Sequence, residues 1–214
     1  MSDGLGFELV LVDPKPELCA AWEEAFRGRS EVHVVCGRFE GLSAFDCMVS
    51  AANSFGLMDG GVDAAITRFF GQDLMERVQC RILDEYLGEQ PVGTSMIVET
   101  GHPQHPYLAH TPTMRTPMTI ARTDNVYRAM SSMLLAVRRH NGSGARPIGI
   151  VACPGLGTRT GRVPLPEAAR QMSIAYRNLL EPPRSITWSF ALGRQEQVRY
   201  GGDLGYLLRS ESEA

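Results

Sequence analysis

An asparagine and an aspartate, separated by glycines, mark the first place in this chain where side chains could do chemistry. The segment SAANSFGLMDGGVDAAI, residues 50–66, carries Asn53 near its start and Asp63 near its end, with Gly60 and Gly61 before the acid. A carboxylate can orient a water molecule or take a proton, while a carboxamide can hold part of a ligand in place. Each residue alone is typical of a turn or of the first turn of a helix. The two together, at this spacing, favour a functional site.

A second glycine-rich loop, CPGLGTRTGRVP, occupies residues 153–164. Like the first loop, it follows an apolar run and precedes a helical pattern. Exposed backbone N–H groups in such loops, with the positive end of a helix dipole behind them, form an anion site. Two such loops suggest a ligand with more than one phosphate. Neither loop matches the dinucleotide fingerprint GxGxxG or the phosphate loop GxxxxGK[ST].

Two other patterns allow different chemistry. Cys153 and Arg159 fit C-x5-R-T, the phosphate-binding loop of cysteine phosphatases, in which a thiolate attacks phosphorus. Ala152 stands where that family has a histidine, and the alternative is that Cys153 is a small buried hydrophobic residue. His102 and His105 lie among prolines with no carboxylate nearby, so we assign them to a loop and assign no metal.

The hydrophobic pattern predicts strands alternating with helices. The expected strands are 7–12, 32–36, 47–49, 94–98, 107–110, 147–153 and 186–191, and the expected helices are 17–26, 62–70, 74–87, 125–139 and 167–180. This alternation is typical of an α/β domain with helices on both faces of a mainly parallel sheet. We expect one domain over residues 1–200, in which 1–30 form an additional βα unit, and a flexible tail at 201–214.

The composition indicates in which compartment the protein is expected and which classes of partner are not expected. A net charge of −3 gives no general attraction to nucleic acid or to anionic membranes. The N-terminus lacks a signal peptide pattern and no run has transmembrane length. The five cysteines are scattered without a CxxC pair, which is typical of a reduced, intracellular protein without structural zinc. We therefore expect a cytoplasmic protein with no membrane partner and no cofactor.

The segment DCMVSAANSFGLMDGGVDAAI resembles the signature of macrodomains, commonly written as an acid, apolar residues, NAAN, a glycine run and VDGAI. GTSMIVETGHPQHPYLAH is similar to the family's pair of strands ending in a histidine, and the loop from Gly155 resembles its second phosphate loop. The resemblance spans roughly residues 31–190 and implies a three-layer α/β/α sandwich with a mixed, mainly parallel sheet. It also implies that ADP-ribose or an ADP-ribosylated substrate is the partner.

The resemblance implies a role for individual residues. Asn53 and Asp63 match the hydrolytic subgroup, in which both take part in ester cleavage and the asparagine binds the distal ribose. Ser50 replaces the family's first asparagine, and Arg38 replaces the aspartate that reads the adenine amino group, for which Glu40 is the candidate substitute. The residues implied in ligand binding are Phe39, Ala52, Asn53, Gly60, Gly61, Val62, Gly155, Leu156, Gly157, Thr158, Arg159, Thr160 and Gly161.

The resulting prediction is a hydrolase for ester-linked ADP-ribose. The alternatives are a binding module without turnover, in which Asp63 is only structural, and the cysteine phosphatase. Phe39, Trp188 and Phe190 are expected in the core, with Phe39 also the aromatic candidate for contact with a base.

Overall fold

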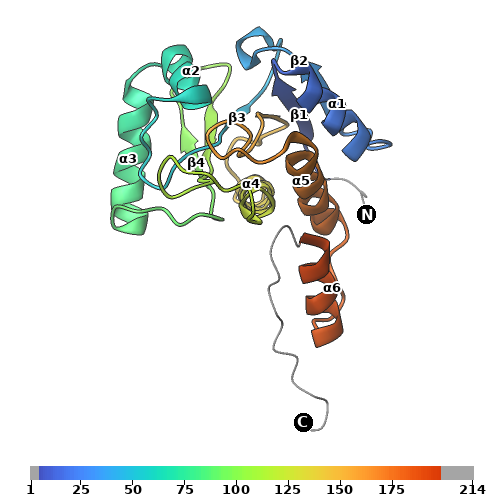
Figure 1. Ribbon diagram of the computed structural model, residues 1–214. Coiled ribbons are helices and arrows are strands. Elements are labelled where there is room, and N and C mark those ends of the chain that lie inside the picture. The colour runs from blue at the N-terminus through green and yellow to red at the C-terminus, as the bar shows by residue number, and fades with distance from the viewer. Residues whose placement is uncertain (1–4, 199–214) are drawn as a thin grey trace.

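The strand-forming runs assemble into one six-stranded sheet of order β2-β1-β6-β3-β5-β4 (Figure 1). The structure is a computed structural model and describes residues 5–198. Every neighbouring pair is parallel except β4 with β5, so the predicted mixed, mainly parallel sheet is confirmed. The strands are β1 (Glu8–Asp13), β2 (Val32–Cys36), β3 (Cys47–Ser50), β4 (Met96–Glu99), β5 (Tyr107–His110) and β6 (Ile150–Cys153).

All five predicted helices are present, with ends shifted by a few residues. Helix α5 begins two residues earlier than expected, because Pro166 lies in its first turn, where the missing N–H is not needed. The helices are α1 (Pro16–Ala25), α2 (Gly61–Phe70), α3 (Asp73–Tyr86), α4 (Asn125–Asn141), α5 (Leu165–Leu180) and α6 (Trp188–Val198), with a 3-10 turn, η1 (Phe39–Gly41).

Helices cover both faces of the sheet, which confirms the three-layer architecture. Leu9 and Leu11 of β1 pack into a core with α1, α4 and α5. Val12 of β1 and Met48 of β3 belong to a second core, which α2 and α3 cover. Successive strand residues point to opposite faces, so nearly continuous apolar runs such as LVLV supply both cores.

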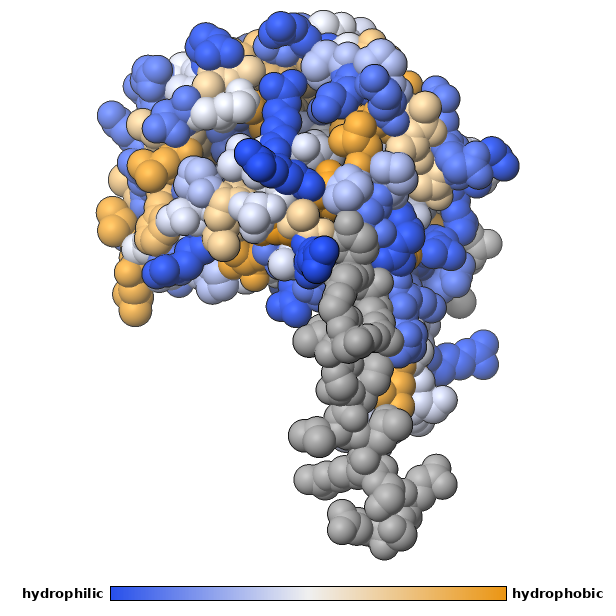
Figure 2. Space-filling view, viewed as in Figure 1, coloured by the Kyte–Doolittle hydropathy of each residue, from blue (hydrophilic) through white to orange (hydrophobic). Residues whose placement is uncertain are grey.

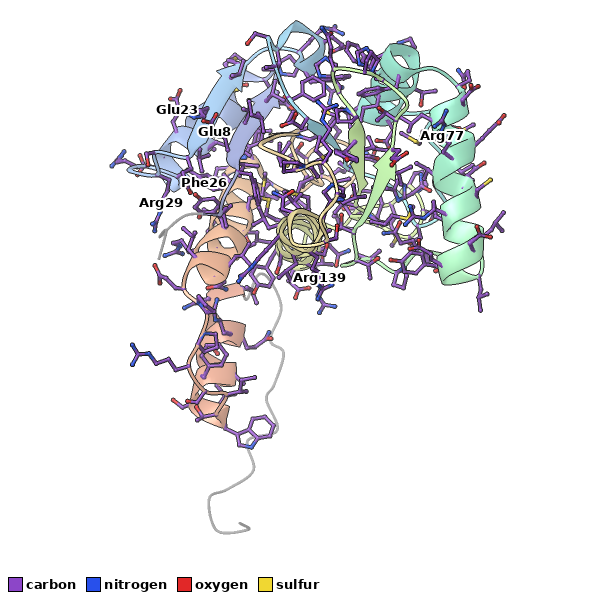
Figure 3. The ribbon with its side chains drawn as sticks, turned by 180° about the vertical axis from the view of Figure 1, so that it is seen from behind. Glu8, Glu23, Phe26, Arg29, Arg77 and Arg139 are labelled. Atoms are coloured by element: carbon purple, nitrogen blue, oxygen red, sulfur yellow. The ribbon has the colours of Figure 1, made fainter. Side chains whose placement is uncertain are left out.

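The N-terminal βα unit lies inside the sheet. Leu11 of β1 is paired with Val34 of β2 on one side and with Cys153 of β6 on the other. Phe26, just after α1, packs the edge of its ring against Tyr176 of α5, with 5.7 Å between ring centroids (Figure 3). Strand β1 therefore reaches the same sheet edge as the glycine loops.

The strand predicted at residues 186–191 is wrong, because the chain forms helix α6 from Trp188. The aromatic and β-branched residues there suggested a buried strand, but Ile186 is 84% exposed and Trp188 is 81% exposed. The prediction that Trp188 lies in the core is therefore also wrong. Phe190 is half-buried, and the Arg194 guanidinium lies 5.1 Å from its ring centroid. The tail predicted at 201–214 lies outside the described residues.

The surface is that of an ordinary folded domain. The face seen in Figure 2 is mostly hydrophilic, with hydrophobic residues in small groups. Leu83 and Leu87, on and just after α3, are among the exposed large hydrophobic residues, and single exposures of this kind are common. Between residues 5 and 198, the helices are too short or too polar to cross a lipid bilayer.

Candidate functional site

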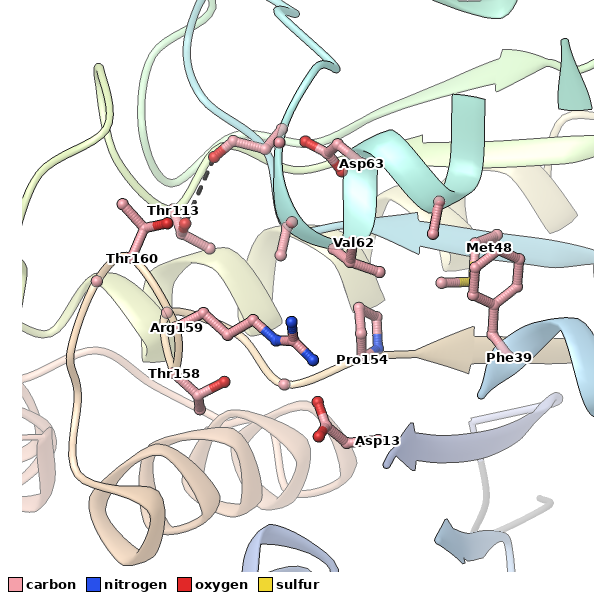
Figure 4. Close-up of a pocket in the computed structure, with 18 of the residues that line it drawn as sticks. Asp13, Phe39, Met48, Val62, Asp63, Thr113, Pro154, Thr158, Arg159 and Thr160 are labelled. Carbon is pink, nitrogen blue, oxygen red and sulfur yellow. Dashed lines mark hydrogen bonds between the residues drawn. The ribbon is translucent and has the colours of Figure 1, made fainter. Parts of the chain in front are cut away.

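A cleft of about 320 Å³ opens at the carboxyl ends of β1, β2, β3 and β6, the edge where open parallel sheets bind ligands. Its volume is in the range of small-molecule sites. Both glycine-rich loops line the cleft, one following β3 and the other following β6 (Figure 4). The loops are distant in sequence but meet here because β3 and β6 are neighbours in the sheet.

Most of the residues singled out in the sequence line this cleft. Leu156 does not: its side chain is fully buried in the core beneath the second loop, so only its main chain is available to a ligand. The predicted residues that line the cleft are Phe39, Ala52, Asn53, Gly60, Gly61, Val62, Asp63, Gly155, Gly157, Thr158, Arg159, Thr160 and Gly161.

Neither backbone conformation nor packing explains the glycine at position 60. Gly60 is the N-cap of α2, with φ −131° and ψ 155°, which is extended backbone that any residue can adopt. A Cβ atom built on Gly60 would meet no atom within 4 Å, and the same is true of Gly61. Gly60 therefore keeps a space in the cleft free of side chains, whereas the φ of +58° at Gly61 by itself favours glycine.

The backbone N–H groups of the first loop are unpaired where it enters α2. The first helical hydrogen bond runs from the Ala64 N–H to the Gly60 carbonyl, at 3.2 Å. Within residues 5–198, no protein acceptor receives the N–H groups of residues 58–63. Free donors at the positive end of a helix dipole form a binding site for an anion.

The second loop combines unpaired donors with glycines that packing requires. A Cβ atom on Gly155 would lie 2.6 Å from Leu18 Cδ2, and one on Gly161 would lie 2.5 Å from the Gly157 carbonyl. No acceptor in the described part of the chain receives the N–H groups of residues 155–161. Arg159 is exposed at the rim of the cleft. The two loops thus present unpaired N–H groups to one cleft.

The Asn53 side chain forms hydrogen bonds with the backbone of the loop in which it lies. Its Oδ1 accepts hydrogen bonds from the N–H groups of Phe55 and Leu57, at 3.1 and 3.3 Å, and its Nδ2 donates to the Leu57 carbonyl at 2.8 Å. The carboxamide therefore fixes the path of the chain toward Gly60. One Nδ2 proton remains for a ligand.

Asp63 is a buried carboxyl group beside the cleft, in the first turn of α2. The Ser50 hydroxyl donates to its Oδ1 at 2.7 Å. Burial raises the pKa of Asp63 to about 7, while the Ser50 hydrogen bond lowers it and the charge of Asp59 raises it. A carboxyl group that titrates near neutral pH can both take and return a proton.

Cys153 is not placed as a phosphatase nucleophile. Its side chain is fully buried in the core and does not line the cleft, although Arg159 of the same pattern does. Burial raises the pKa of the Cys153 thiol far above its usual range, so the thiol is protonated at neutral pH. Because the attacking species in that chemistry is the thiolate, the structure argues against the cysteine-phosphatase alternative.

The three histidines of the β4–β5 region have structural contacts. His105 stacks on Phe45, with ring centroids 3.9 Å apart, and His102 stacks on Phe69. His110, the last residue of β5, is fully buried, and its Nδ1 lies 2.6 Å from the Gln90 Oε1. Burial lowers the pKa of His110 to about 3, so this imidazole is neutral.

Sequence reasoning missed the part of the cleft that β1 contributes. Val12, Asp13 and Pro14 line it, next to Arg38 and Glu40, which follow β2. The signal in the sequence was an aspartate at the end of a predicted strand, but its place in the strand order could not be known. The remaining cleft residues that were not predicted are Met48, Ala51, Leu57, Asp59, Ala65, Arg68, Thr113, Met114, Pro117, Pro154 and Gly37.

Phe39 belongs to both the core and the cleft. It is buried, and its ring meets Phe45 and Phe69 edge to face, with centroids 6.4 and 5.4 Å apart. It also lines the cleft, at the end formed by β1 and β2. A rigid aromatic wall therefore closes that end.

Comparisons with known proteins identify the family and support the fold. The Macro domain family matches residues 49–172. An uncharacterized protein of Aquifex aeolicus is 32% identical over 143 residues, which cover 66% of this chain and 78% of that protein. An O-acetyl-ADP-ribose deacetylase of Escherichia fergusonii is 37% identical over 83 residues, 39% of this chain and 45% of the deacetylase, so the match spans less than half of that enzyme.

Solved structures show the same fold. A mutant of the Oceanobacillus iheyensis macrodomain, solved with ADPR, superposes with a TM-score of 0.56 at 20% identity, covering 76% of this chain and 88% of that one. The macrodomain of Mycobacterium tuberculosis DarG gives a TM-score of 0.53 at 18% identity, covering 64% and 84%. This chain belongs to the Macro domain family.

Proposed function

We propose that the protein binds ADP-ribose in this cleft and hydrolyses ADP-ribose linked through an ester, on a protein or in a related metabolite. The observation that carries the proposal is that two loops with unpaired N–H groups line one cleft, in which Gly60 leaves a space free of side chains. Membership of the Macro domain family and the partial match to an O-acetyl-ADP-ribose deacetylase support it.

In the proposed complex, the pyrophosphate lies between the α2 N-terminus and the second loop, where the N–H groups can donate to its oxygens. Residues 155–161 supply one side and residues 60–62 the other. The distal ribose lies near Asn53 and Asp63, and the remaining Nδ2 proton of Asn53 donates to a ribose hydroxyl. Phe39 and Ala52 contribute apolar walls.

Asp63 is the proposed acid–base group. Its carboxylate takes a proton from a water molecule as the water oxygen adds to the ester carbonyl carbon. The bond between that carbon and the ribose oxygen then breaks, and the proton passes to the leaving ribose oxygen. The Ser50 hydroxyl holds Oδ1 and leaves Oδ2 for the water.

A binding module without turnover is the second candidate. Two observations favour it: the Asn53 carboxamide is already used within its own loop, and Asp63 is only 6% exposed. In that case Asp63 is a carboxyl group at a helix N-terminus, and the cleft reads ADP-ribose without cleaving it.

Calorimetric titration tests ligand binding. ADP-ribose is expected to bind, and AMP to bind much more weakly, because AMP lacks the second phosphate and the distal ribose. Gly60→Val is expected to abolish binding without unfolding the protein, since its backbone angles suit valine and no protein atom is in the way. Gly193→Val on α6, also in open space, is the matched control. Equal affinities for AMP and ADP-ribose would reject the proposal.

Release of ADP-ribose from a peptide modified on glutamate, measured in a single turnover, separates enzyme from binding module. Asp63→Ala is expected to slow release by about 10²- to 10⁴-fold, the usual effect of losing one acid–base group. Asn53→Ala should weaken both binding and turnover. If the wild-type protein binds ADP-ribose but releases none above the uncatalysed rate, the protein is a binding module.

A further inference from the structure

Asp13 is a buried carboxylate in the cleft, and it comes from outside the segment that matches the family. The match begins at residue 49, whereas Asp13 is the last residue of β1, which lies between β2 and β6. Asp13 is 9% exposed and lines the cleft. No role follows for it from the family match.

One Asp13 oxygen is held by the protein and the other is available. Oδ1 accepts the Lys15 N–H at 3.0 Å. Oδ2 lies 3.3 Å from the point where a Cβ atom on Gly155 would be, and no donor within residues 5–198 bonds to it. In Figure 4 the carboxylate points from the end of β1 toward Pro154 and Arg159, yet no described residue forms an ion pair with it.

A carboxylate with a free oxygen selects the part of a ligand that can lie against it. It accepts hydrogen bonds from N–H and O–H groups, and it repels phosphate oxygens. The neighbouring candidates are less suited: Arg38 has no acceptor atom, and Glu40 is exposed on η1. Asp13 therefore faces a neutral hydrogen-bond donor of the ligand.

The strand order indicates which end of the ligand lies beside Asp13. Strands lie about 4.8 Å apart, so β2 and β3, separated by β1 and β6, are about 14 Å apart. A pyrophosphate bound by the β6 loop and the α2 N-terminus lies in the middle of this span. If the distal ribose lies at Asp63 after β3, the nucleoside lies over the ends of β1 and β2, beside Asp13 and Phe39.

We propose that the Asp13 carboxylate accepts a hydrogen bond from the exocyclic amino group of the base and so selects adenine. This inference rests on the proposed function, because it requires a nucleotide in the cleft. It assigns base selection to the N-terminal βα unit, and it replaces Glu40 as the substitute for the missing aspartate at Arg38.

The test compares ADP-ribose with IDP-ribose, in which an oxygen replaces the amino group, by calorimetry. The wild-type protein is expected to bind ADP-ribose about tenfold more tightly or better, since the analogue leaves a buried acceptor facing an acceptor. Asp13→Asn should bring the two affinities close together, because the asparagine amide can donate to the analogue's oxygen. Its Oδ1 can still accept the Lys15 N–H, which preserves the local fold. Asp84→Asn, at an exposed position of α3 that does not line the cleft, is the matched control and should keep the wild-type preference. Glu40→Gln tests the rival carboxylate of the cleft and should keep the preference if Asp13 contacts the base.

The possible results of this experiment distinguish failure of the proposed function from failure of the proposed role of Asp13. If the wild-type protein binds neither ligand, the proposed function fails and the role of Asp13 fails with it. If it binds both equally well, or if Asp13→Asn keeps the wild-type preference, ADP-ribose binding stands and the role of Asp13 is refuted. If only Glu40→Gln loses the preference for ADP-ribose over IDP-ribose, Glu40 is the residue that contacts the base, and the inference about Asp13 is refuted. The comparison of the two ligands on the wild-type protein tests the inference even if a variant fails to fold.

Discussion

Replacing Asp63 by asparagine is expected to stabilise the protein at neutral and alkaline pH. Burial raises the pKa of Asp63 from 3.8 to about 7, so the folded state holds a proton that the unfolded state has released. Each pH unit between the two values is worth about 1.36 kcal/mol. The ionised carboxylate therefore lowers the free energy of unfolding by about 4 kcal/mol above pH 7. This penalty is absent below pH 4 and grows as the pH rises from 4 to 7.

Urea unfolding from pH 4 to 8.5 measures the effect. The asparagine keeps an acceptor for the Ser50 hydroxyl, so Asp63→Asn removes the charge without removing the contact. Its advantage over wild type should increase with pH and level off above 7. Asp84→Asn, on the exposed face of α3, should show no such increase. A difference between Asp63→Asn and wild type that is the same at pH 4.5 and 8 would refute the reasoning.

Three further predictions follow from the buried groups. Ser50→Ala removes a hydrogen bond to the Asp63 carboxylate, so the pKa of Asp63 and the lower limb of the pH–rate profile should move up by about one pH unit; an unmoved profile would contradict this. Thiol labelling of the native protein should be fast at the exposed Cys36 and Cys80 and slow at the buried cysteines, and fast labelling of all five would contradict the fold. Gly157→Ala should lower the free energy of unfolding by about 1–3 kcal/mol, measured by thermal unfolding, because the residue has φ +68° and its Cβ would crowd core side chains at 3.0 Å; an unchanged melting temperature would contradict this.

The sequence predicted the features that depend on local pattern. The apolar runs at 32–36 and 107–110 are strands in the structure with those bounds. Both glycine loops were recognised because their turns and helix starts are encoded within a few residues. Their meeting in one cleft was also predictable, since ligands of parallel sheets collect at the carboxyl ends of strands.

The roles of individual side chains within the loops were harder to predict from the sequence. Asn53 was predicted as a ligand-binding residue, and the structure shows its carboxamide bonded within its own loop. Such bonds depend on the path of the loop, which the residue types alone do not determine. The same limit applies to Leu156, which sequence reasoning placed in the loop's binding surface and which packs into the core.

The error at residues 186–191 and the omission of Asp13 have a common physical origin in the strand order. A late apolar run beginning at Ile186 suggested another strand. In the structure, β1 and not this late run pairs with β6 on the side away from β3, and the late segment forms α6. Pairing between the two ends of a chain is non-local, and no short pattern in the sequence encodes it. Because β1 occupies that interior position, its last residue, Asp13, borders the second glycine loop. If Asp13 reads the base, the N-terminal βα unit contributes to specificity as well as to the sheet.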